Sequence, residues 1–176
     1  MSLEDALRRA AMLDAKMHRE AKGHELPLPH AVFSQLRAYL IRRAEGIAAE
    51  NNVWQLLKFS SAIGGLSYIA LGPTFDKGLS PYHFRFDSGA RLSFGLTLRE
   101  DDRLSRLVSA RYHYQLPEGQ SPAFFRFDLI DAPHENPLLE PCSHLHPGLE
   151  HVRLPVAIHD PIEVLDRIFF VIERNP

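Results

Sequence analysis

The stretch YHFRFDSGARLSFGLTLRE, residues 82–100, decides the fold, because apolar and polar side chains alternate along it with a period of two. A turn at Ser88-Gly89 divides it into two runs. The same alternation returns in VSARYHYQ, residues 108–115, and in AFFRFD, residues 123–128. Because short polar turns join these four runs, the pattern predicts an antiparallel meander.

Each predicted strand has an apolar face, which helices would cover most simply. The opposite face carries a set of basic, imidazole and carboxylate side chains: His83, Arg85, Arg111, His113, Arg126 and Asp128. Residues two apart on a strand share a face, so pairing in chain order would bring these groups together. Arginine binds phosphate or carboxylate in a fork, and histidine moves protons near neutral pH. The alternative, which stays open, is a solvated face with cross-strand ion pairs.

Helical patterns flank the meander. Apolar residues recur at three- and four-residue steps over 3–21, and a second helix is predicted from Pro29 to Asn51. Asp160 followed by a proline predicts the start of a last helix. Residues 53–72 fit either a helix or strands broken by a Gly-Gly pair.

We therefore expect an α+β fold, with an antiparallel meander of about five strands, an N-terminal helix pair and a C-terminal helix covering one face. Residues 1–52 would form a helical lobe and residues 53–176 the sheet domain, packed as one compact unit. Trp54 is expected in the core. The arginines of the second helix are expected on a solvated face: Arg37, Arg42 and Arg43.

Residues 130–150 are rich in proline, which predicts a loop and argues against a central strand. His144 and His146 in this segment would place two imidazoles on one side of an extended chain. With Asp128, Asp131 or His134 they could bind zinc or another divalent metal. Two alternatives stay open, namely a histidine acting as general acid or base, and a histidine bonded to backbone carbonyls.

Composition narrows the class of protein. The chain has 176 residues, 45% of them hydrophobic, which fits one globular domain. The formal net charge of −2 does not indicate a nucleic-acid or membrane partner, but a local basic patch on a nearly neutral protein is compatible with one. A single cysteine, Cys142, excludes an intrachain disulfide. We find no apolar stretch of bilayer length, no secretory signal and no Gly-rich phosphate loop, so we expect a cytoplasmic protein without a nucleotide cofactor.

Three motifs resemble those of the TumE-like toxins of bacterial toxin–antitoxin systems: YHYQ at 112–115, RFDLIDAPH at 126–134 and HLH at 144–146. The resemblance covers about residues 82–172. Together with the polar face, it implies a toxin-like protein that acts on RNA by phosphodiester cleavage, an endoribonuclease. The alternative is a non-catalytic binding or accessory module whose helices in 1–52 contact a protein partner, such as an antitoxin. A third hypothesis is a metal-dependent enzyme that acts on a small molecule.

Under the leading hypothesis the residues divide into three roles. The catalytic candidates are His113, Asp128, His134, His144 and His146. The candidates for binding the substrate phosphate are Arg85, Arg111 and Arg126. No cofactor is expected except a divalent metal, for which the candidate ligands are Asp131, His144 and His146.

Overall fold

The computed structural model describes most of the meander and the elements that flank it. The described residues are 8, 12, 25–44, 52–61, 64–73, 83–130, 143–156 and 160–173. The predicted first helix, apart from two isolated residues, and the predicted end of the second helix at 45–51 lie outside the described residues.

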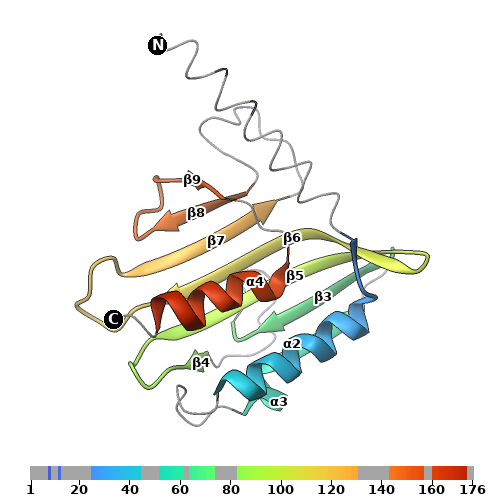
Figure 1. Cartoon of the computed structure of the whole chain (residues 1–176), viewed down its shortest axis with the longest axis horizontal. Coiled ribbons are helices and arrows are strands. Elements are labelled where there is room, and N and C mark those ends of the chain that lie inside the picture. Colours follow the sequence, from blue (N-terminus) through green and yellow to red (C-terminus); the bar gives the residue numbers. More distant parts are fainter. Residues whose placement is uncertain are drawn as a thin grey trace.

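A nine-stranded antiparallel sheet forms the body of the described chain (Figure 1). Its strands are β1 (Glu25–Leu26), β2 (Leu57–Ser61), β3 (Leu66–Leu71), β4 (Phe84–Arg85), β5 (Arg91–Asp101), β6 (Leu104–Gln115), β7 (Phe124–Ile130), β8 (Ser143–Pro147) and β9 (Leu154–Pro155). The order across the sheet is β2-β3-β5-β6-β7-β8-β9, while β1 pairs with β6 and β4 with β5. The α+β class and the antiparallel meander are confirmed, but the expected count of about five strands is too low.

Part of the difference comes from residues 53–72, which contain both of the structures that the pattern allowed. Val53–Leu56 form a single helical turn, α3, and the Asn52 side chain accepts a hydrogen bond from the backbone N–H of Gln55 at 3.3 Å. The chain then enters β2 and returns as β3. Gly64 and Gly65 lie between these strands with φ values of +88° and +74°, a backbone conformation that favours glycine.

The short strand β1, which pairs with β6, was not predicted either. A further strand comes from the proline-rich segment, where the prediction of a loop is wrong for residues 143–147. These residues form β8, which lies between β7 and β9. The described proline of this strand, Pro147, is its last residue, so its missing N–H costs the ladder little. The two-residue strand β9 follows and pairs antiparallel with β8.

A β-bulge corrects one detail of the predicted alternation. Thr97 pairs with Ser109, and the next residue, Leu98, pairs with Leu107, so Val108 is the extra residue of β6. Val108 is therefore only partly buried, and Leu107 takes the buried position instead. On the far side of the bulge the alternation holds as predicted, and Tyr112 and Tyr114 are buried.

Helices α2 (Pro29–Ala44) and α4 (Pro161–Asp166) lie across the apolar face of the sheet (Figure 1). The last helix continues from α4 into a π-helical segment, η1 (Arg167–Ile172). As predicted, the Asp160 side chain caps its start, accepting from the Ile162 N–H at 2.7 Å. One hydrophobic cluster joins both helices to the strands, and its fully buried members include Leu36, Leu40, Phe94, Tyr112, Leu165 and Phe169.

The prediction that Trp54 belongs to the core is wrong. In the short helix α3, Val53 and Leu56 face the core, while the Trp54 side chain stays 64% exposed. The guanidinium of Arg37 lies 4.2 Å from its ring centroid, a cation–π contact. Arg43 lies similarly over Phe170 at 4.4 Å, so these two arginines are partly covered, while Arg42 is exposed as expected.

Candidate functional site

Register places the predicted site residues in two adjacent rows across the polar face of the sheet. One row runs over β5 to β8 through Ser93, His113, Arg126 and His146. The next row, two residues along, runs through Gly95, Arg111, Asp128 and His144. The helices occupy the other face, so the packing of the core and the arrangement of the polar groups are separated by the thickness of the sheet.

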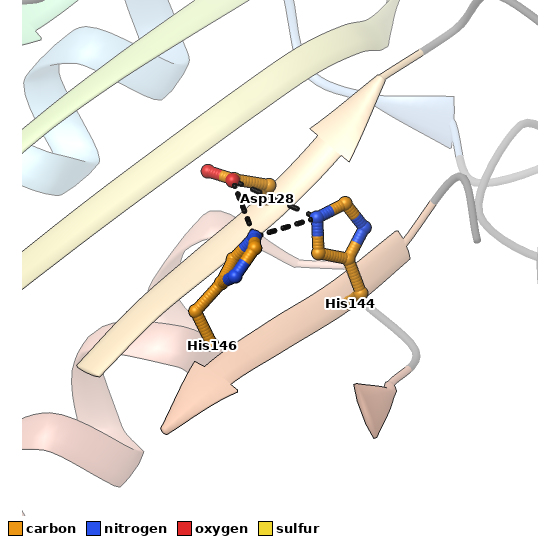
Figure 2. Close-up of side chains that lie close together, drawn as sticks. All are labelled: Asp128, His144 and His146. Carbon is orange, nitrogen blue, oxygen red and sulfur yellow. Dashed lines mark hydrogen bonds and ion pairs between the residues drawn. The ribbon is translucent and has the colours of Figure 1, made fainter. Parts of the chain in front are cut away.

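Asp128, His144 and His146 form a compact group between β7 and β8 (Figure 2). The Nε2 atoms of the two imidazoles are 3.0 Å apart. The Oδ2 atom of Asp128 lies 3.7 Å from Nε2 of His144 and 3.5 Å from Nε2 of His146. All three residues are buried, with exposures of 1–3%, so the carboxylate needs charged or hydrogen-bonded partners to offset its loss of hydration.

Two arginines supply these partners. Arg126 donates from Nε to Oδ2 of Asp128 at 2.8 Å, and Arg111 donates from Nε to Oδ1 at 3.1 Å. Arg126 also donates from Nη1 to both carboxylate oxygens of Glu150, each at 2.7 Å. These hydrogen bonds from Arg126 lower the pKa of the Glu150 carboxyl below its ordinary range. The hydrogen bonds of Arg126 therefore connect β7 to the turn that follows β8.

The contacts of His146 define its tautomer. Nη2 of Arg126 lies 2.9 Å from Nε2 of His146, and because a guanidinium can only donate, Nε2 must accept. The proton of the neutral ring is then on Nδ1, which faces the Leu149 carbonyl oxygen at 3.4 Å. The lone pair of Nε2 is therefore used in the hydrogen bond from Arg126, close to Asp128 and His144.

His113 lies at the more open end of the same face. Its ring meets the edge of Phe124 at 5.4 Å between centroids, and both side chains are partly exposed. Burial, followed by the positive charge of Arg126, lowers the pKa of His113, and His83 is close enough to act in the same direction. Burial, with Arg91 and Arg85, also lowers the pKa of His83. This part of the face therefore favours neutral imidazoles beside arginines.

The structure brings together six of the residues that the sequence singled out: Arg111, His113, Arg126, Asp128, His144 and His146. Arg85 is exposed on β4, opposite Arg91 on β5, away from the buried group. Asp131 and His134 lie outside the described residues. Because Asp128, His144 and His146 are buried, a polymer bound to this face would not touch them directly.

Sequence reasoning missed two residues of the site. Glu150 clamps Arg126 from the turn that follows β8, and no local pattern predicts this contact. Phe124 falls on the polar side of the alternation in β7. Its position opposite Gln115 and next to the predicted Arg126 could have marked it as a flat ring beside His113.

The arrangement defines an α+β protein whose antiparallel sheet carries a buried Asp-His-His group that could hold a metal ion. No protein-family model matches the chain, and neither the curated proteins nor the solved structures give a significant match. The likeness to TumE-like toxins thus stays a prediction from motifs. Among the described residues, no helix is long and apolar enough to cross a membrane.

Proposed function

We propose that this protein acts on RNA as a toxin-like endoribonuclease, with the open end of the polar sheet face as its active site. The observation that carries the proposal is the pairing of His113 directly opposite Arg126, with Arg111 two residues away on the same strand. An imidazole beside guanidinium groups is a combination suited to proton transfer at a phosphodiester.

His113 would be the general base. Its lowered pKa keeps the ring neutral at physiological pH, so it can accept a proton from the ribose 2′-OH. The 2′-oxygen then attacks phosphorus, the bond from phosphorus to the 5′-oxygen breaks, and the leaving oxygen takes a proton from water. The products are a 2′,3′-cyclic phosphate and a 5′-hydroxyl end, and no metal takes part in this step.

Arg111 would hold the phosphate. Its side chain is 38% exposed and donates from Nε to Asp128, whereas that of Arg126 is 14% exposed and is bonded to Asp128, Glu150 and His146. Arg126 therefore contributes positive charge near the phosphate and positions its neighbours. The partly exposed ring of Phe124 would offer a base a surface for stacking next to His113.

The test is to incubate the purified protein with total RNA, with and without chelator, and to analyse the ends of any fragments. We expect cleavage that survives the chelator and leaves cyclic phosphates. His113→Ala should reduce the rate by about 100-fold, the usual scale of acid–base catalysis. His151→Ala, which alters an exposed imidazole beyond β8, is the matched control and should cleave normally.

Intact RNA at stoichiometric protein, combined with normal growth of cells expressing it, would remove this proposal. Equal cleavage by wild-type protein and His113→Ala would move the reaction away from this face.

A second candidate is a non-catalytic module that contacts a protein partner through its N-terminal region. The observation in its favour is the exposed Trp54 with Ile41, 64% and 38% exposed, beside the aromatic-stacked Arg37. If growth inhibition by the expressed protein is lost in Trp54→Ala and kept in His113→Ala, the partner surface explains the phenotype. The reverse result supports the nuclease.

A further inference from the structure

The three ligand atoms of the buried group have the spacing of a metal site. Their separations are 3.0, 3.5 and 3.7 Å, between the two Nε2 atoms and from each of them to Oδ2 of Asp128. A point equidistant from three atoms so spaced lies about 2.0 Å from each, which is the length of zinc bonds to histidine nitrogen and carboxylate oxygen. Figure 2 shows both imidazoles and the carboxylate directed toward one another.

We propose that Asp128, His144 and His146 bind one divalent transition-metal ion, with the ligands supplied by two adjacent strands. Two imidazoles and one carboxylate suit zinc or a neighbouring first-row ion, whereas magnesium prefers oxygen ligands only. The extended geometry of β8 places both imidazoles on the same side, and the register of β7 puts Asp128 opposite His144. The inference does not rest on RNA cleavage.

The surroundings of the ligands have the form that metal sites require. Nδ1 of His146 faces the Leu149 carbonyl oxygen, the usual way in which a metal-binding imidazole is oriented, so Nε2 is the nitrogen that can bind an ion once its hydrogen bond with Arg126 is broken. Arg111 holds Oδ1 of Asp128 and thereby leaves Oδ2 directed at the imidazoles. Burial of all three ligands at 1–3% exposure strengthens the attraction of the carboxylate for a cation.

Arg126 is the competitor of the ion. Its guanidinium is bonded to Oδ2 of Asp128 and to Nε2 of His146, which are two of the three ligand atoms. A cation there must displace these two hydrogen bonds. Glu150 can retain the displaced guanidinium, because both of its oxygens already bind Nη1 and its side chain is 67% exposed at the rim. Metal and guanidinium are therefore alternative occupants of the same position.

The experiment uses the full chain purified without a histidine tag, stripped with chelator and titrated with Zn²⁺, Co²⁺ and Mg²⁺. We expect one Zn²⁺ per chain, visible absorption bands for Co²⁺ with nitrogen ligands, and no saturable binding of Mg²⁺. His144→Ala and His146→Ala should each weaken zinc binding by at least about 100-fold. His113→Ala and His151→Ala keep the fold and the other imidazoles and should bind as the wild type does.

A separate variant tests the competition between the Arg126 guanidinium and the metal ion. Arg126→Met removes the guanidinium and its positive charge, so zinc affinity should rise by about tenfold even though the stripped protein is less stable. Unchanged or weaker zinc binding by folded Arg126→Met would refute the competition.

The metal site is tested first on the wild-type protein, so the test does not depend on variants that fold poorly. If the stripped wild type takes up no zinc at one per chain, or if zinc binds equally to wild type and to the folded His144→Ala and His146→Ala chains, the metal site is refuted. Neither result bears on cleavage of RNA in the presence of chelator, which tests the proposed function separately.

Discussion

Both faces of the central strands contain buried side chains, but these are buried by different means. On one face, side chains such as Phe94 and Tyr112 pack beneath α2 and α4. On the other face, Asp128 and His144 are as inaccessible to water, at 2% and 3% exposure, yet they are held by directed hydrogen bonds and ion pairs. Residues that are equally buried on the two faces should therefore differ in how well they tolerate substitution.

The physical reason lies in what each face needs. Apolar contacts are non-directional, so a side chain of similar volume can replace another with a small adjustment. A buried charge must keep every partner, because any partner that is removed leaves an unpaired group in a medium of low dielectric. The polar face should thus be the more sensitive of the two to conservative substitution.

The largest effect is expected at Asp128. Asp128→Ala leaves Arg126 and two buried imidazoles without their carboxylate, and we expect the free energy of unfolding to fall by about 3–5 kcal/mol. Urea denaturation measures this, with Asp87→Ala as the control on an exposed turn. A loss below about 1 kcal/mol would mean that the buried ion pairs of Asp128 contribute no more to stability than exposed ones do.

Gly148, which follows β8, is the next most sensitive position. Its φ of +80° is strained for any side chain, and a Cβ atom would lie 2.4 Å from Cβ of Pro122. Gly148→Ala should therefore cost about 1–3 kcal/mol and disturb the contact of Glu150 with Arg126. Gly119→Ala is a useful comparison, because its φ is also positive but a Cβ there meets nothing within 4 Å. Equal losses would show that strain alone, without the Pro122 contact, decides the effect.

A conservative change on the apolar face should matter less. Phe169 is fully buried against Phe84, Phe86 and Tyr39. Phe169→Leu keeps an apolar side chain of comparable size, so the expected loss is about 1–1.5 kcal/mol by the same urea measurement. If it instead equals the loss for Asp128→Ala, the contrast between the two faces fails.

The smallest effect concerns pH. Burial, with Arg126 and His83, lowers the pKa of His113 below its ordinary value of 6.5, while Glu150 and Asp128 oppose the shift. The unfolded chain therefore binds this proton at a higher pH than the folded chain, and stability is lost as the pH falls below about 6.5. Thermal unfolding of His113→Asn from pH 8 to pH 5 should show a shallower decline than that of the wild type. An identical decline would mean that His113 is not buried in solution.

Local pattern predicted the meander because alternation with a period of two depends only on neighbouring residues. It also predicted that Arg111, His113, Arg126 and Asp128 share a face, since pairing in chain order follows from short turns. The His-x-His pair was predicted on one side of an extended segment, and β8 confirms this geometry.

What the sequence did not predict depends on contacts between distant segments. The depth of burial of His144 and His146, the clamp of Glu150 on Arg126 and the exposure of Trp54 arise from which surfaces meet in three dimensions. The bulge at Val108 and the strand at 143–147 need the partner strand to be known before they can be placed.

Among the described residues, β9 is the last strand of the sheet on the side of the candidate site. It has two residues, and one of them is Pro155, so it can present at most one backbone N–H to an incoming strand. A second chain approaching this border finds too few donors to extend the ladder. We expect the protein to resist fibre-like self-association through this border, at concentrations where a longer strand free of proline would recruit further copies.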